Sequence, residues 1–308
     1  MRDPLAPLAA QSELRLIRAP WAPGLVLAFA RWRGDRPALS PLGSGAGERA
    51  EDARNRALGE LAENLSILPA AHAGPVPARD AAGRLVLADA RALPGPGGLG
   101  SEGVAAGPDP QSARLAAFCE RAERAALALW WQGTLPAHRA PDALCLPTLR
   151  AGASARQGLT LALELLPGLA VRLVVTCDPD GGRPSLGSAA HPEADTAAAA
   201  ALREAMQAEL AWLMPDHHPD RAERDLRAHG LAARLPSLHA AAAAAPPSAP
   251  ATLPALLAAL AGSKLAHGFA DLTVPDLTGP NPAIPVWRFV CPDWPLARPL
   301  FQPLAAPP

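Results

Sequence analysis

The chain has 308 residues and a mass of 31.7 kDa, long enough for one large domain or two small ones. Apolar residues make up 49% of it, so it can bury a sizeable core. A formal net charge of −1 argues against a protein that binds nucleic acid through a basic face. The four cysteines include no C-x-x-C pair, which argues against a zinc ribbon and a disulfide scaffold.

Nothing in the sequence resembles a membrane-targeting segment. The N-terminus has no continuous apolar stretch of the kind found in signal peptides. The most apolar long stretch, residues 239–262, is interrupted by four prolines, whereas a membrane span needs about 20 unbroken apolar residues. We therefore expect a soluble, cytoplasmic protein that does not contact a membrane.

Five elements are predicted in the first half of the chain. Residues 24–32 are apolar and β-rich, which predicts a strand, and the glycine-rich stretch 40–47 predicts a turn. Apolar residues at helical spacing predict a helix from about Glu48 to about Ile67. A short strand is expected at 84–89, and a long helix at 111–131 after Pro110.

The second half mixes strands and helices. Two strands are predicted at 158–166 and 169–178, separated by Pro167-Gly168, followed by a helix at 195–213 capped by Asp195 or Thr196. The remaining elements are helices at 219–233 and 252–262, a surface loop at 239–251, a strand at 284–291 and a Pro-rich tail at 292–308. Because βαβ alternation is not regular, the sequence predicts an α+β or mixed α/β fold.

Common catalytic motifs are missing from the sequence. No lysine follows the glycine-rich loop as a Walker-type ATP site requires, no G-x-G-x-x-G directly joins a predicted strand to a predicted helix, and no G-x-S-x-G occurs. His217 and His218 are adjacent, so their side chains point in different directions, and we interpret them as part of a solvated turn. No repeat of fixed period is apparent.

Three predicted helices each carry two polar residues spaced three apart. This spacing places both side chains on one helix face. If the three faces converged, they would form a carboxylate-rich site for Mg²⁺ and the phosphates of a nucleotide. Each pair alone is more typical of a solvated surface than of a metal site. The pairs are Glu60 with Glu63, Glu120 with Glu123, and Glu204 with Gln207.

Segments around these pairs resemble the YcaO family, ATP-dependent enzymes that modify peptide backbone amides. Residues 43–64 (GSGAGERAEDARNRALGELAEN) are similar to its S-x-x-x-E-x-x-E-R motif. SEGVAAG at 101–107 and FCERAERAALALWW at 118–131 are similar to S-N-G-x-A-x-G and E-x-x-E-R-D. Residues 186–210 resemble G-S-A followed by E-x-x-Q, and 271–292 a closing strand with an arginine. The resemblance implies one YcaO-like catalytic domain over 1–308.

The resemblance also implies roles for individual residues, with ATP and Mg²⁺ as cofactors. The implied metal ligands are Glu60, Glu63, Glu120, Glu123 and Glu204. The implied nucleotide contacts are Glu102, Arg124, Gln207 and Arg288. In active members a Pro-rich C-terminus often reaches the active site, which implies a catalytic role for Pro308.

Four residues depart from the family pattern. Arg56 stands in place of the motif serine, Asn64 in place of an arginine, Glu102 in place of an asparagine and Ala125 in place of an aspartate. These departures bear on ATP turnover more than on the fold. They support a second hypothesis, in which the chain is a non-catalytic scaffold subunit of a peptide-modification complex.

The chemistry implied by the resemblance is cyclodehydration of a ribosomally made precursor peptide in natural-product biosynthesis. A Cys, Ser or Thr side chain attacks the preceding amide carbonyl, ATP phosphorylates the resulting oxyanion, and phosphate leaves to give a thiazoline or oxazoline. Sulfide or an amine as nucleophile would instead give a thioamide or amidine. The implied partners are the peptide, a separate E1-like protein that binds its leader, and a flavin-dependent dehydrogenase. A homodimer is the default oligomer.

Overall fold

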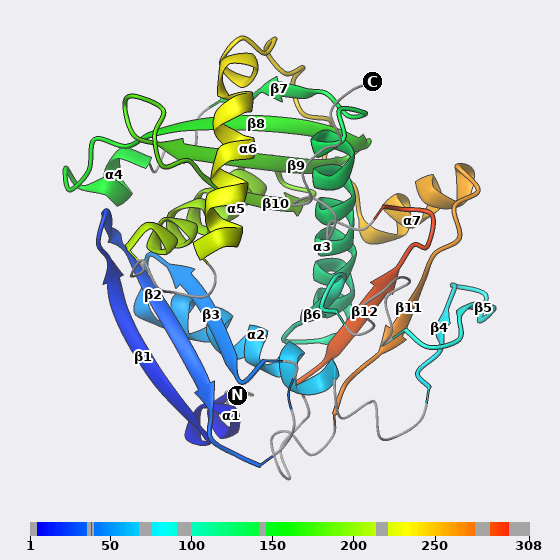
Figure 1. The fold of residues 1–308 in the computed structure, drawn as a ribbon. Coiled ribbons are helices and arrows are strands. Elements are labelled where there is room, and N and C mark those ends of the chain that lie inside the picture. The colour runs from blue at the N-terminus through cyan, green and yellow to red at the C-terminus, as the bar shows by residue number, and fades with distance from the viewer. Residues whose placement is uncertain are drawn as a thin grey trace. The chain divides into compact units, whose positions relative to one another are not determined.

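The computed structural model describes residues 5–35, 38, 40–67, 75–90, 100–141, 146–213, 221–274 and 284–295 (Figure 1). The chain divides into two compact units. The first comprises Met1–Arg18, Leu25–Ala122 and Thr252–Trp294, and the second Ala19–Gly24, Glu123–Ala251 and Pro295–Pro308. Each unit combines segments that are distant in sequence. The single catalytic domain over 1–308 stays a prediction.

The first unit contains an antiparallel sheet in the order β1-β2-β3, packed on helix α2. The strands are β1 (Ser12–Ala19), β2 (Ala22–Trp32) and β3 (Leu42–Gly47), and α2 spans Ala50–Ile67. The strand predicted at 24–32 and the helix predicted at 48–67 are confirmed. The turn predicted at 40–47 is wrong, because its glycines form β3 and let the backbone of α2 approach closely.

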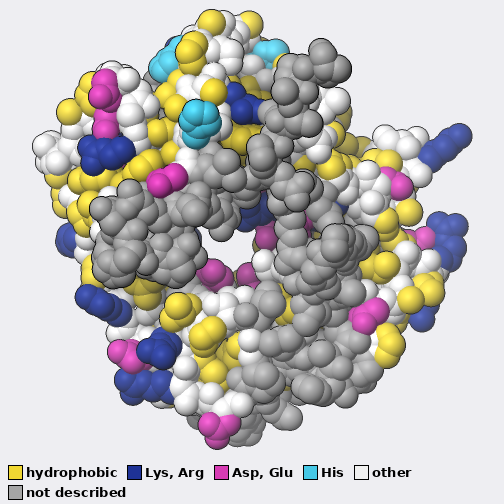
Figure 2. Space-filling view, viewed as in Figure 1, with side chains coloured by type: hydrophobic (Ala, Val, Ile, Leu, Met, Phe, Trp, Pro, Cys, Tyr) yellow, Lys and Arg dark blue, Asp and Glu magenta, His cyan; other side chains and the backbone are white. Residues whose placement is uncertain are grey.

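Strand β1 lies at the outer edge of this sheet. Arg15 and Arg18 are exposed on it, and Figure 2 shows basic side chains along this part of the unit. The opposite end of the sheet is occupied by β3, which α2 covers. The core between β2 and α2 consists of alanine and leucine side chains together with Val26: Ala28, Ala30, Ala53, Ala57, Leu58, Leu61 and Leu65.

A second antiparallel sheet in the first unit has the order β5-β4-β11-β12-β6. Its central strand pair, β11 (Gly268–Asp271) and β12 (Val286–Val290), is flanked by three short strands. Phe118 of helix α3 packs against Phe289 of β12, with ring centroids 5.0 Å apart. The other elements are α1 (Ala6–Ala10), β4 (Ala78–Arg79), β5 (Leu85–Leu87), β6 (Val104–Ala106), α3 (Pro110–Trp131, which continues into the second unit) and α7 (Leu253–Gly262).

The second unit is built on an antiparallel sheet in the order β10-β9-β8-β7. Every residue of β9 is buried, which is typical of a central strand with both faces covered. Helix α5 packs on β9 and β10, as Figure 1 shows. The elements are β7 (Ala137–Arg139), α4 (Leu146–Arg150), β8 (Gln157–Leu166), β9 (Leu169–Cys177), β10 (Ser185–His191), α5 (Ala194–Ala208), the 3₁₀ helix η2 (Glu209–Leu213) and α6 (Arg221–His239).

A buried ion network joins η2 to α4 and to the sheet of the second unit. Glu209 is 3% exposed and accepts two hydrogen bonds of 2.6 Å from Arg150. Its Oε1 also accepts from Arg156 at 3.0 Å and from the Thr176 hydroxyl at 2.6 Å. Arg156 forms a further ion pair of 2.7 Å with Asp178. One buried carboxylate is therefore shared by two buried guanidinium groups.

Most predicted elements are confirmed, together with the mixed α/β fold class. The helix predicted at 195–213 is α5 followed by η2, and its N-cap is Glu193 rather than Asp195 or Thr196. The sequence did not predict β1, β7, β10 or β11. His217, His218 and most of the Pro-rich tail lie outside the described residues. No described helix has both the length and the apolarity needed to cross a membrane.

Candidate functional site

Glycines of β3 determine how the first pair of glutamates is presented. A Cβ atom on Gly43 would lie 2.2 Å from the Ala57 carbonyl oxygen, and one on Gly45 would lie 2.5 Å from that of Ala53. Such distances are far below contact, so only glycine permits this approach of α2. The close packing brings Glu60 to the free edge of β3. There its Oε2 accepts hydrogen bonds from the Ser44 backbone N–H at 2.7 Å and hydroxyl at 2.9 Å.

Glu63, one turn further along α2, is tied to a different strand. Its Oε1 accepts a hydrogen bond of 2.8 Å from the backbone N–H of Ala106 in β6. Desolvation raises the pKa of Glu63 to about 8, the Ala106 hydrogen bond lowers it in part, and the negative charge of Glu60 raises it further. Desolvation also raises the pKa of Glu60, although this residue is exposed, and the Ser44 hydrogen bonds counteract it. The two carboxylates therefore repel each other.

The second unit contains the same arrangement at β10 and α5. A Cβ atom on Gly187 would lie 2.1 Å from the Ala201 carbonyl oxygen, so a glycine again allows the helix backbone to approach. Glu204 on α5 accepts a hydrogen bond of 2.8 Å from the backbone N–H of Ser188. As with Ser44 and Glu60, the serine precedes the glutamate by 16 residues.

Ser188 also holds a carboxylate of α3. Its hydroxyl donates a hydrogen bond of 2.7 Å to Oε1 of Glu123. Desolvation raises the pKa of the buried Glu123 carboxyl to about 7, the charge of Arg124 lowers it, and that of Glu204 raises it. The Nε atom of Arg124 lies 3.9 Å from Glu123 Oε1. Ser188 therefore binds two carboxylates that repel each other: its backbone N–H binds Glu204, and its hydroxyl binds Glu123.

The two strand–helix modules, β3–α2 and β10–α5, also match in sequence. Without gaps, residues 43–60 align with 187–204. The identical pairs are Gly43 and Gly187, Ser44 and Ser188, Ala46 and Ala190, Ala50 and Ala194, Ala53 and Ala197, Ala57 and Ala201, Leu58 and Leu202, and Glu60 and Glu204. The sequence analysis missed this repeat and both serines. The Gly-Ser pair placed 16 residues before a glutamate is the signal that would have found them.

Other residues assigned from the resemblance lie in varied surroundings. Arg288 is fully buried and donates hydrogen bonds to the backbone carbonyls of Ala90, Gly100 and Glu102, which favours a structural role. Glu102 is 8% exposed, and its charge acts on the buried guanidinium of Arg121. The nucleotide contacts of Glu102 and Arg288 stay predictions.

The remaining assigned residues lie on the same helices as the anchored glutamates. Glu120 is half-buried on α3, one turn before Glu123, and Gln207 is half-buried on α5, one turn after Glu204. Pro308 lies outside the described residues. The structure therefore anchors Glu60, Glu63, Glu123 and Glu204 by hydrogen bonds from residues of β3, β6 and β10. Glu120 and Gln207 lie one helical turn from Glu123 and Glu204.

Two departures from the family pattern have structural partners. The Nη1 atom of Arg56 donates to the Ala46 carbonyl at 2.6 Å, and the Asn64 side chain donates to the Leu42 carbonyl at 3.0 Å. Both bonds link α2 to β3. Ala125 is fully buried in α3. These three residues therefore help to hold the fold.

The described carboxylates fit a magnesium ion that is shared with phosphates. In the described ranges, no three Asp, Glu, His or Cys side chains gather closely enough to hold a metal by themselves. Mg²⁺ is usually bound by one or two carboxylates together with phosphate oxygens and water. Pairs of glutamates that repel each other and have raised pKa values gain most from a nearby cation. The donor chemistry of each pair is therefore suitable for this ion.

Comparisons with known proteins identify the class. A family model described as YcaO cyclodehydratase, ATP- and Mg²⁺-binding, matches residues 95–294. The chain belongs to the YcaO family. This confirms the family and the cofactors, ATP and Mg²⁺, that the sequence predicted. No curated protein matches the chain in sequence.

Solved structures share the fold at low sequence identity. YcaO from Methanopyrus kandleri, bound with AMPPCP and Mg²⁺, has a TM-score of 0.68 and 16% identity, covering 96% of this chain and 90% of that chain. A heterocyclase in complex with substrate and cofactor has a TM-score of 0.67 and 18% identity, covering 92% of this chain and 50% of that chain. The E. coli microcin synthetase McbBCD complex has a TM-score of 0.60 and 13% identity, covering 92% of this chain and 88% of that chain.

The raised pKa values predict how the stability of the ligand-free protein depends on pH. The folded state favours protonated Glu63 and Glu123, so their stabilisation is complete below the usual carboxyl pKa and is lost as pH rises through about 7 and 8. We expect the Tm in metal-free buffer to fall between about pH 5 and pH 8. Glu63→Gln, which mimics the protonated carboxyl, should flatten this slope, whereas the exposed Glu51→Gln on α2 should not. A Tm that rises over this range would contradict the assignment.

Proposed function

We propose that the chain is an ATP- and Mg²⁺-dependent cyclodehydratase that converts Cys, Ser or Thr residues of a ribosomal precursor peptide to azolines. The observation that carries the proposal is the pair of Gly-Ser strands that hold Glu60 and Glu204 by the same hydrogen bond, with Glu63 and Glu123 alongside. We propose these glutamates, with Glu120, as the Mg²⁺ ligands. Arg124, Gln207, Glu102 and Arg288 are proposed to contact the nucleotide.

The proposed role of these residues is to position charge. When bound, Mg²⁺ would supply neutralisation of the negative charge that develops on the phosphates. Ser44 and Ser188 each donate to one oxygen of a glutamate and fix its direction, so little reorganisation is needed when the nucleotide binds. The guanidinium of Arg124 adds a positive charge that is 34% exposed beside Glu123. We also propose that the protein is cytoplasmic and forms a homodimer.

The proposed partners follow the same logic. One E. coli microcin synthetase McbBCD structure contains bound pro-MccB17. We propose that this chain likewise acts on a precursor peptide, delivered by a separate E1-like protein, with a flavin-dependent dehydrogenase acting afterwards. The Pro-rich tail is proposed to contribute Pro308 to catalysis. Sulfide or an amine in place of the peptide nucleophile would give a thioamide or amidine enzyme with the same nucleotide chemistry.

A non-catalytic scaffold is the second candidate. The observation that favours it is the structural use of departures from the family pattern, since Arg56 and Asn64 bind backbone carbonyls that link α2 to β3. Calorimetric titration with AMPPCP, with and without Mg²⁺, distinguishes the two. Binding only in the presence of Mg²⁺ supports the enzyme. No binding by a folded sample, repeated with an E1-like partner, supports the scaffold.

Ser188 offers a test of how the carboxylates are positioned. Ser188→Ala removes the hydroxyl that binds Glu123 but keeps the backbone N–H that binds Glu204. A hydrogen bond to a charged group contributes about 1.5 kcal/mol, so we expect Mg²⁺-dependent AMPPCP binding to weaken about 10-fold. Ser237→Ala on α6, whose hydroxyl bonds only within its own helix, is the control. If Ser188→Ala bound AMPPCP as tightly as the parent, the Ser188 hydroxyl would have no role in positioning Glu123.

A further inference from the structure

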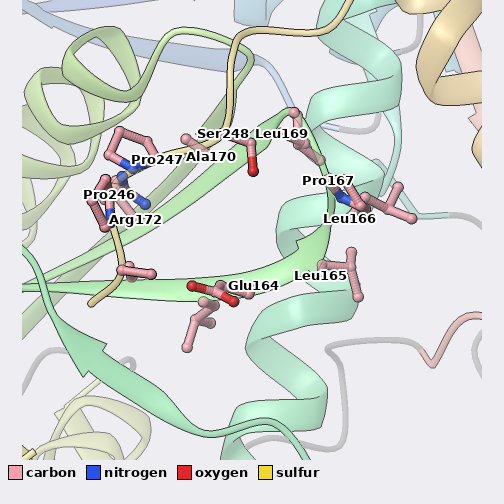
Figure 3. Close-up of a pocket in the computed structure, with 14 residues that line it drawn as sticks. Glu164, Leu165, Leu166, Pro167, Leu169, Ala170, Arg172, Pro246, Pro247 and Ser248 are labelled. Carbon is pink, nitrogen blue, oxygen red and sulfur yellow. The ribbon is translucent and has the colours of Figure 1, made fainter. Parts of the chain in front are cut away.

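A pocket of about 270 Å³ lies at the end of the β8–β9 hairpin, within the second unit (Figure 3). Its walls combine apolar side chains, with Leu166, Leu169, Pro246 and Pro247 among the lining residues, with nearly as much polar surface. Ligand pockets typically measure about 300–1,000 Å³ and combine apolar walls with a few polar groups. The volume of this pocket lies just below that range, so the pocket is suited to a small ligand.

One wall is a segment of chain fixed at both ends. At one end, the Arg139 N–H donates to the Ala242 carbonyl at 2.8 Å, and the Ala244 N–H donates to the Arg139 carbonyl at 2.7 Å. At the other end, the Ala251 N–H donates to the Gly168 carbonyl at 3.0 Å. Two prolines between these anchors restrict the backbone further. The predicted surface loop at 239–251 is therefore a tethered wall of the pocket.

Arg172 of β9 supplies a buried positive charge to the pocket. The residue is 8% exposed, and Figure 3 shows it beside Pro246 and Pro247. Among the described residues its only hydrogen bond runs from Nη1 to the Val171 carbonyl at 3.2 Å. A guanidinium has five N–H donors, so most of them are available to a ligand. Desolvation lowers the pKa of Arg172, and the charges of Asp195 and Glu164 counteract this.

Glu164 supplies a negative charge on the neighbouring strand. Glu164 of β8 follows the regular β8–β9 pairing, which is interrupted between Leu163 and Leu166, and it lines the same pocket as Arg172. Glu164 is exposed at the pocket and forms no ion pair with Arg172, although its charge acts on that guanidinium. The pocket thus presents a donor group and an acceptor group with apolar surface around them (Figure 3).

We propose that this pocket binds an α-amino carboxylate with an apolar side chain, either a free amino acid or the C-terminal residue of a peptide. The carboxylate accepts hydrogen bonds from Arg172, since guanidinium groups match carboxylates in geometry and charge. The nitrogen on the same carbon donates to Glu164, and the side chain lies on the leucine and proline walls. The site does not depend on the proposed nucleotide chemistry.

Three probes test the proposal by NMR titration of the full chain: L-leucine, N-acetyl-L-leucine and N-acetyl-L-leucinamide. At least one acid should bind with a Kd below about 10 mM, and the amide should bind at least about 10-fold more weakly. Binding of both acids identifies a peptide C-terminus, and binding of L-leucine alone identifies a free amino acid. Equal binding of the amide, or no binding of any probe, would overturn the proposal.

Two variants and a control locate the site. Arg172→Gln should weaken acid binding at least about 10-fold, whereas Arg15→Gln, an exposed arginine of β1, should leave it unchanged. If Arg172→Gln fails to fold, Glu164→Gln decides, because Glu164 is exposed and we expect its replacement to preserve the fold. That variant should weaken whichever acid binds, by removing the charged acceptor for its nitrogen. Unchanged binding in Glu164→Gln would contradict the assignment.

Discussion

Glu123→Gln is expected to weaken Mg²⁺-dependent AMPPCP binding about 100-fold, because it removes one charge while keeping the shape of the side chain. Glutamine can still accept the Ser188 hydroxyl hydrogen bond, so the neighbouring Glu204 should keep its own contact with the Ser188 N–H. The same result is expected for Glu63→Gln, whose side-chain oxygen can still accept from Ala106. Calorimetric titration measures both.

Matched controls separate loss of a ligand from a general change in charge. Glu193→Gln changes a glutamate before α5 whose side chain makes no capping hydrogen bond, and Glu51→Gln changes an exposed glutamate in the first turn of α2. Both should bind AMPPCP as the parent does. Parent-like binding in Glu123→Gln and Glu63→Gln, with thermal unfolding unchanged, would show that these glutamates do not hold the metal.

Glu209→Gln is expected to cause the largest loss of stability. It removes the carboxylate charge shared by Arg150 and Arg156, both about 95% buried, and leaves two guanidinium groups without their main counterion. Breaking a buried ion pair by removing one partner typically costs about 3–5 kcal/mol. Urea denaturation should therefore show a lower midpoint for the second unit. Asp178 still pairs with Arg156 in this variant and offsets part of the loss.

An exposed ion pair provides the comparison for this network. Asp52 contacts Arg49 at 2.8 Å, but the Arg49 side chain is 73% exposed. Water screens this pair, so Asp52→Asn should leave the urea midpoint nearly unchanged. If Glu209→Gln and Asp52→Asn shifted the midpoint equally, burial would not be the source of the effect at Glu209.

The sequence was sufficient for the long helices and the β8–β9 hairpin. Helices α2 and α3 have apolar residues at helical spacing, and β8 and β9 are apolar stretches separated by Pro167-Gly168, so their local patterns agree with the fold. Strands β3 and β10 were missed because Gly43, Gly45 and Gly187 resemble turn residues. Their glycines are required by close contact with a helix that follows later in the chain, and a local pattern does not contain that contact.

The candidate site was predicted at the level of residue type. Spacing of three residues identified the glutamate pairs, and family resemblance gave them a role. Neither spacing nor resemblance identified Ser44, Ser188 or the Ala106 N–H as partners of these glutamates. Those hydrogen bonds join strands to helices, and a local sequence pattern does not contain such contacts. Arg288 shows the opposite case. Its buried guanidinium binds backbone carbonyls of distant residues, contacts that only the tertiary structure reveals, while the nucleotide contact that the resemblance implies stays a prediction.

The position of Ser44 and Ser188 has a consequence for solubility. Strands β3 and β10 each end their sheet, and an open edge of unpaired N–H groups is a template for aggregation. In both strands the carboxylate of the following helix occupies the serine N–H and blocks addition of another strand. Glu60 and Glu204 therefore protect the edges of their sheets, so this protective role and the proposed Mg²⁺-binding role rest on the same two side chains.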